Sequence, residues 1–263
     1  MAIAPAARTS HPPGLYVLFF TEMWERYSFY SMMAILSLYM NEALHFDVAK
    51  VGSIYGSYNM GVYLMPVAGG LIADRWLGFS RSIIVGGVLM MLGHLVLGVE
   101  ALPFFYGGLV LLACGSGLLK PNVSTLVGNL YRDRPELRDQ GFNIYYMGVN
   151  IGAFVSPLTV AWLRANYGWS VAFMSAALAM LLSLAIFVGF KHYLADADVK
   201  SEVADRVVSR PLAPGEVRSR VITLLFQLFS LIFNLLLVGF VFCDFGVESL
   251  RALPFARSRT LRR

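Results

Sequence analysis

The sequence has few charged residues for its length. Only 14% of its 263 residues are Asp, Glu, Lys or Arg, whereas 57% are hydrophobic and the mean hydropathy is +0.64. A soluble domain of this size would have too little polar sequence to cover its surface. The composition therefore predicts an all-α polytopic membrane protein, with lipid as one of its partners.

Cysteine and histidine are also scarce, and neither type is clustered. Cys114 and Cys243 lie in separate apolar runs, and the four histidines are scattered singly, so no metal site or disulfide framework is expected. The sequence has no zinc-binding helix motif, nucleophile elbow or phosphate-binding glycine loop, so we expect neither an enzyme nor a cofactor. Although the pI is near 9.3, no basic patch is interleaved with aromatics, and nucleic acid is not an expected partner.

Apolar runs of about 20 residues predict seven membrane-spanning helices. The first six form one bundle over residues 15–190, and a polar, proline-containing linker over residues 191–220 precedes the seventh. Residues 1–14 lack the features of a removable signal peptide, so we expect them to be a cytoplasmic tail. The predicted spans are residues 15–40, 51–73, 82–99, 104–130, 141–163, 169–190 and 221–242.

Lys and Arg are distributed unevenly between the two sides of this predicted bundle. With the N-terminus in the cytoplasm, the outer loops hold only Lys50 and Arg164. The positive-inside rule therefore places the N-terminus inside. The cytoplasmic segments hold Arg8, Arg75, Arg81, Arg132, Arg134, Arg138, Lys191, Lys200, Arg206, Arg210, Arg218 and Arg220.

The last segment does not fit this pattern. Residues 243–263 are rich in arginine, yet the alternation of spans would place them outside. Either the seventh span does not cross the membrane, or the tail is not a native segment of the protein, for example the product of a truncated or frame-shifted reading frame. We favour the second hypothesis.

Three charged residues interrupt the first apolar span. Glu22, Glu25 and Arg26 fall near its middle, where each charge costs roughly 2.5–3.5 kcal/mol on insertion scales. Their spacing of three and four residues places them on one helix face, and Tyr30 continues that face. Because apolar sequence flanks the cluster on both sides, we interpret it as an ionisable stripe facing a cavity.

The second span is rich in glycine and tyrosine. We expect its glycines to allow close helix packing, and Tyr63, deep in the span, to face a cavity. Asp74 and Arg75 follow at the helix end, where they are suited to cap the terminus and clamp neighbouring helices. An ordinary positive-inside loop would have similar composition. The glycines are Gly52, Gly56, Gly61, Gly69 and Gly70.

The fourth and fifth spans add further polar groups. Lys120 follows more than ten apolar residues, and the adjacent Pro121 removes one backbone donor, which a polar cavity would tolerate. In the fifth span Tyr146 and Asn150 share a face, and Asn150 is predicted to be buried, either in a site or as an interhelical hydrogen-bonding group. Spans one and four open two successive groups of three, and charge at matching positions of repeats indicates a binding site between them.

Four motifs in this order resemble the proton-dependent oligopeptide transporters of the major facilitator superfamily. Glu22–Tyr30 is similar to the family's first-helix motif of two acids, an arginine and aromatics. The other three resemble its second loop, fourth helix and fifth helix, and they cover Gly69–Gly78, Gly117–Tyr131 and Phe142–Gly152.

The resemblance implies the six-helix N-terminal bundle of the major facilitator fold and uptake of di- and tripeptides driven by the proton gradient. Carried over by motif, Glu22, Glu25, Arg26 and Lys120 would couple protons. Tyr30, Tyr63, Lys120 and Asn150 would bind peptide. The localisation implied is a bacterial inner membrane, and the seventh span would match the first of two additional helices in bacterial members.

The sequence also departs from the family pattern. Many members have a tyrosine where this chain has Phe29 and an arginine where it has Met33. The loss of that arginine leaves a non-peptide anion such as nitrate as an alternative substrate. The family's C-terminal six-helix half is missing, and alternating access requires two halves. We therefore expect this chain to be inactive alone. A non-transporting membrane fragment is the other alternative.

Overall fold

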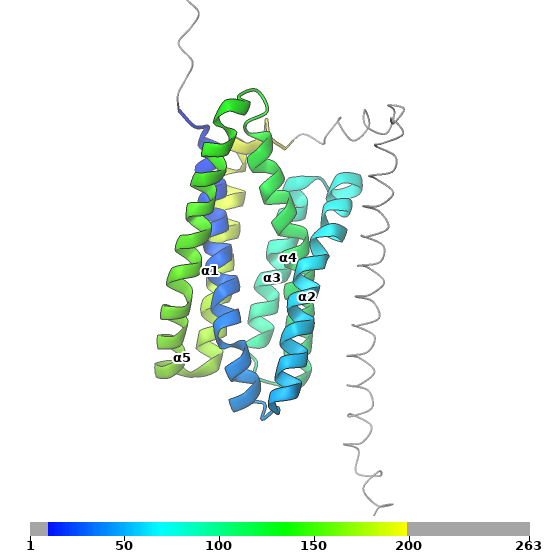
Figure 1. The fold of residues 1–263 in the computed structure, drawn as a ribbon, viewed down its shortest axis with the longest axis vertical. Helices are drawn as coiled ribbons and strands as arrows, with labels where there is room; N and C mark the ends of the chain where they lie inside the picture. The colour runs from blue at the N-terminus through cyan, green and yellow to red at the C-terminus, as the bar shows by residue number, and fades with distance from the viewer. Residues whose placement is uncertain (1–9, 199–263) are drawn as a thin grey trace, which may run out of the picture.

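The computed structural model describes residues 10–198, which form an all-helical bundle (Figure 1). The first four spans are α1 (Pro13–Glu42), α2 (Val48–Ile72), α3 (Phe79–Leu97) and α4 (Leu102–Asn129). The fifth and sixth together make α5 (Arg138–Phe190). The helices match the six spans predicted over residues 15–190 to within a few residues at each end. The predicted seventh span and the Arg-rich tail lie outside the described residues.

A single glycine separates the last two predicted spans. Gly168 has φ +85° and ψ −177°, a conformation that other residues rarely adopt, whereas the rest of α5 is helical. Figure 1 shows the chain reversing direction there, so that the two limbs of α5 run antiparallel. The sequence prediction of two spans, with a break between residues 163 and 169, is therefore confirmed.

By length and composition, three helical stretches of the described chain can cross a membrane. They are Phe79–Leu97, Leu102–Asn129 and Pro135–Leu194, the last of which contains both limbs of α5. The helices α1 and α2 do not meet this criterion of length and composition, although α1 is 30 residues long. The helix α1 carries the charged cluster, and its stability in a bilayer must come from packing inside the bundle.

The helices pack through small residues. The most extensive contacts join α1 to α5, α3 to α4, α2 to α4 and α3 to α5. Gly86 on α3 faces Gly115 on α4 so closely that a Cβ on Gly115 would lie 2.5 Å from the Gly86 carbonyl oxygen. Close backbone approach of this kind is typical of membrane helices, where burial of apolar surface does not drive association.

The prediction for the second span holds for only one of its five glycines. A Cβ on Gly69 would lie 2.0 Å from the Gly117 carbonyl oxygen, so Gly69 does bring α2 against α4. The prediction is wrong for the other four, because they lie on faces of α2 that no described backbone approaches closely. Gly61 would make only an ordinary contact, and the three with nothing within 4 Å are Gly52, Gly56 and Gly70.

Polar contacts close both ends of the bundle. At the end where α1 terminates, Glu42 pairs with Arg164, which lies 4.3 Å from the centre of the Trp169 ring. At the end where α1 begins, the Asp198 carboxylate accepts a hydrogen bond from the Ser80 backbone N–H (3.1 Å), and Asn129 donates to the Ala197 carbonyl (2.9 Å). The predicted linker therefore begins with a segment, residues 191–198, that packs on the bundle.

The Gly86–Gly115 contact predicts a strong effect of one methyl group. We expect Gly115→Ala to lower the free energy of unfolding by about 1–3 kcal/mol, because overpacking forces the helices apart. The matched control is Gly107→Ala in the same helix, where nothing in the described part of the chain lies within 4 Å of the added Cβ. Thermal unfolding in detergent measures both, and equal midpoints for the two variants would contradict the packing argument.

Candidate functional site

The centre of the site is a group of three charged residues on one face of α1. Glu22, Glu25 and Arg26 each expose 3% of their surface or less. The Arg26 Nε atom lies 2.9 Å from Glu22 Oε1 and also pairs with Glu25 Oε2. The prediction that these three head groups share a face is confirmed, and Arg26 is the link between the two acids.

The cluster does not satisfy all of its own hydrogen-bonding groups. Within the described chain, Glu22 Oε2, both Glu25 oxygens and two Arg26 nitrogens have no hydrogen-bond partner. The charges are thus close enough to form ion pairs, but the Arg26 N–H groups do not point at the carboxylate oxygens as hydrogen bonds require. Buried polar atoms left in this state favour a proton, a water molecule or a bound polar ligand.

Lys120 supplies a second cation from the neighbouring helix α4, which stays helical through Pro121. Its Nζ atom lies 5.2 Å from the centre of the Phe29 ring, and Arg26 Cζ lies 5.3 Å from the same centre. Lys120 makes no ion pair with either acid in the described chain, but its charge interacts with those of Glu25 and Glu22. The four groups together carry no net charge when both acids are ionised, so one added proton makes them positive.

Three of the four predicted peptide-binding residues, all except the half-buried Lys120, lie at the surface of the described bundle. Tyr30 is 38% exposed and Tyr63 is 75% exposed, with the Lys120 Nζ 5.8 Å from the Tyr63 ring centre. Asn150 is exposed, so the prediction that it is buried is wrong. Its face of α5 points away from α1, because Gly148 and Gly152 occupy the face that contacts α1. Tyr146 is exposed too, as the shared face predicts.

Asp74 and Arg75 lie on a single π-helical turn, Ala73–Leu77, after α2. Both side chains are exposed, and neither makes an ion pair within residues 10–198. Their role as a clamp between helices stays a prediction.

The structure also brings polar residues to the site that sequence reasoning missed. Tyr145 is 2% exposed, and its hydroxyl interacts with the Glu22 carboxylate and with Ser124 of α4. The sequence does contain a signal for Tyr145, because this residue shares a helix face with Gly148 and Gly152, which pack against α1. On the far side of α1, the buried Ser28 and His94 form a hydrogen bond of 2.6 Å between α1 and α3.

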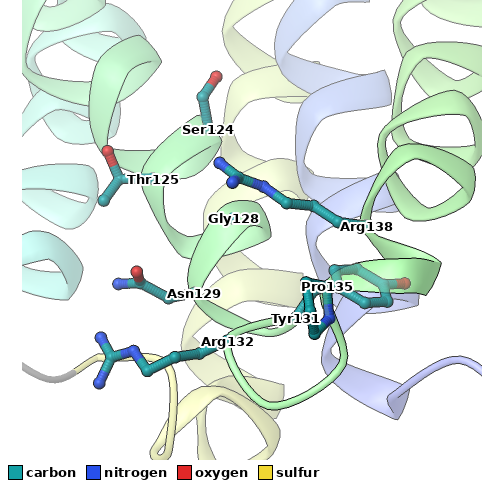
Figure 2. Close-up of a pocket in the computed structure, with 8 residues that line it drawn as sticks. All are labelled: Ser124, Thr125, Gly128, Asn129, Tyr131, Arg132, Pro135 and Arg138. Atoms are coloured by element: carbon teal, nitrogen blue, oxygen red, sulfur yellow. The ribbon is translucent and has the colours of Figure 1, made fainter.

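A cavity of about 540 Å³ opens beside the end of α4 nearest the start of α1 (Figure 2). Figure 2 shows Ser124 and Thr125 on the same helix, with the Arg138 guanidinium reaching from α5 toward Ser124 and Gly128. Two arginines and several hydroxyl and amide groups line it, but no acid. The lining residues are Ser124, Thr125, Gly128, Asn129, Tyr131, Arg132, Pro135 and Arg138.

Comparison with known proteins identifies the family. A family sequence model with the description "POT family" matches residues 80–222, which is more than half of the chain. The chain belongs to the POT family. The POT family consists of membrane transporters rather than enzymes; its members are proton-coupled and require no cofactor.

Related POT proteins are considerably longer than this chain. It is 39% identical over 213 residues to the peptide transporter YePEPT of Yersinia enterocolitica, covering 75% of this chain and 42% of that protein. It is 40% identical over 181 residues to the di-/tripeptide transporter of Lactococcus lactis, covering 66% of this chain and 36% of that protein. The chain therefore spans less than half the length of the curated relatives it matches.

Solved structures agree with the fold. One match is the crystal structure of a variant peptide transporter POT in complex with sulfate. Its sequence is 35% identical to this chain, and the two structures superpose with a TM-score of 0.70. The match covers 91% of this chain and 48% of that chain. The bundle therefore has the architecture of one half of a POT transporter.

The central position of Arg26 predicts a large loss of stability when it is removed. Arg26→Leu leaves two buried acids without their shared cation, so we expect unfolding to become easier by about 3–5 kcal/mol. Adding Glu25→Gln to this variant is expected to restore part of the loss. The control is Glu42→Gln, which breaks an exposed pair and is expected to cost less than about 1 kcal/mol. Thermal unfolding that ranks Glu42→Gln with Arg26→Leu would contradict this.

Proposed function

We propose that this chain forms the N-terminal half of a proton-coupled symporter for di- and tripeptides. The observation that carries the proposal is the buried cluster of Glu22, Glu25 and Arg26 next to the half-buried Lys120. Ionisable residues buried in a membrane helix are expensive, and they mark ion or substrate pathways. A cluster that has no net charge and incomplete hydrogen bonding is suited to take up a single proton.

The proposed coupling follows from charge. With both acids ionised, the Lys120 ammonium is attracted to the carboxylates of α1. When one acid takes up a proton, this attraction weakens and Lys120 becomes available to the carboxylate end of a peptide. One proton moving down 100 mV supplies about 2.3 kcal/mol, which is enough to concentrate a small solute.

Peptide is the substrate best supported by the relatives. One is named a peptide transporter and another a di-/tripeptide transporter. Tyr30, Tyr63 and Asn150 present exposed phenol and amide groups, which are suited to hydrogen-bond a peptide backbone next to Lys120. Met33 packs against the apolar core. We therefore favour peptide over nitrate.

A second six-helix half is the partner that this function requires. Alternating access needs two bundles that rock about one site, and the chain covers less than half of its relatives. We propose that the exposed faces bearing Tyr63 and Asn150 are directed toward that half, and that Asp74 and Arg75 clamp the bundle at its cytoplasmic end. The arginines near the start of α1 and the end of α4 support a cytoplasmic N-terminus in a bacterial inner membrane.

Transport by a completed protein tests the proposal. We expect this chain joined to the C-terminal half of a full-length relative to take up a dipeptide into liposomes when the outside is acidic, and the chain alone not to do so. Nitrate in excess is expected to leave this uptake unchanged. Competition by nitrate without competition by unlabelled dipeptide would contradict the substrate assignment.

The coupling role makes a separate prediction. In the completed protein, Glu22→Gln with Glu25→Gln is expected to abolish proton-driven uptake, because neither side chain can then release or accept the coupled proton. Exchange of labelled for unlabelled dipeptide across the membrane, without a proton gradient, is expected to continue. Glu42→Gln, an exposed acid on the same helix, serves as the control. Uptake by the double variant at the unsubstituted rate would show that the coupling role is wrong.

A further inference from the structure

Tyr145 connects the buried cluster to a second helix. It lies on the face of α5 that packs against α1, and its hydroxyl interacts with Glu22 on one side and with Ser124 on the other. The residue is almost fully buried, with 2% of its surface exposed. A hydroxyl donates one hydrogen bond and accepts up to two, so Tyr145 is able to connect an acid to another hydroxyl.

Ser124 in turn lines the cavity at the end of α4 (Figure 2). Polar groups therefore follow one another from the buried Glu22, through Tyr145 and Ser124, to an open space of about 540 Å³. Thr125, the next hydroxyl on the same helix, also lines this cavity, and it donates to the Pro121 carbonyl of its own helix (2.9 Å).

The composition of the cavity bears on whether a proton that reaches it could be retained there. No Asp or Glu lines it, whereas Arg132 and Arg138 do. The Arg138 guanidinium lies beside Gly128, where an added Cβ would be 3.3 Å from its Nη2 atom. The lining therefore holds no acid that could retain a proton reaching the cavity.

We propose that Tyr145 and Ser124 form the release route by which the coupled proton leaves Glu22 for the cavity at the end of α4. This inference rests on the proposed symport function. In the step, the protonated Glu22 gives its proton to the Tyr145 oxygen while the Tyr145 proton passes to Ser124. The Ser124 proton passes to a water molecule in the cavity. Each hydroxyl gains and loses one proton, and Glu22 ends as a carboxylate.

Glu25 has no equivalent route in the described chain. Its aromatic neighbour Tyr58 interacts with it electrostatically, but the Tyr58 hydroxyl is buried and has no hydrogen-bond partner within residues 10–198. Tyr58 is therefore a packing residue whose hydroxyl is not linked to another polar group of the described chain. It offers a matched control for Tyr145, because both are buried tyrosines next to an acid of the cluster.

The test uses the completed protein in liposomes and measures two rates. Net dipeptide uptake driven by a proton gradient, with proton entry followed by a pH-sensitive dye, requires proton release. Exchange of labelled for unlabelled dipeptide does not. We expect Tyr145→Phe and Ser124→Ala each to slow net uptake and proton entry by roughly tenfold while exchange continues, as for loss of a positioned proton-transfer group. The control Tyr58→Phe is expected to match the unsubstituted protein in both rates.

The results separate the two levels of the proposal. Tyr145→Phe with unchanged net uptake, or with net uptake and exchange reduced equally, would overturn the release route and leave the symport function intact. A completed, unsubstituted protein that takes up no dipeptide with protons would overturn the proposed function, and the release route with it.

Discussion

The structure depends on one electrostatic constraint, which is that two acids inside an otherwise apolar bundle need Arg26 paired with both and Lys120 close by to balance their charge. A charge in this position is tolerated only if other helices shield it from lipid. The small residues Gly148 and Gly152 let α5 lie directly against α1, and they leave room for the charged face beside α4. The same packing that shields the cluster brings Tyr145 to Glu22. Stability and the candidate site therefore arise from the same contacts.

Much of the fold could be predicted from sequence because apolar runs of membrane length are strong signals. The six spans over residues 15–190, including the break between residues 163 and 169, follow from hydropathy alone, and the structure places Gly168 at that break. The shared face of Glu22, Glu25 and Arg26 follows from helical periodicity alone. These features depend only on residues near one another along the chain.

Features that depend on which helices become neighbours were harder to predict. Asn150 was expected to be buried because it is a polar residue deep in a span, yet its direction depends on which face of α5 meets α1. All five glycines of α2 are predicted to make close helix contacts, but within the described residues only Gly69 does so, on the face of α2 that meets α4. Tyr145 was missed because Tyr146 beside it has the same chemistry and points the other way.

The contact between Asp198 and the start of α3 has a mechanical consequence. Leu194 and Ala197 are buried, and the Ser80 N–H and Asn129 amide hold the backbone on either side of the bundle's end. The polypeptide therefore leaves the bundle from an anchored point, and a rigid-body tilt of the six helices would carry that point with it. Residues 191–198 would thus move as part of the bundle, together with α3 and α4.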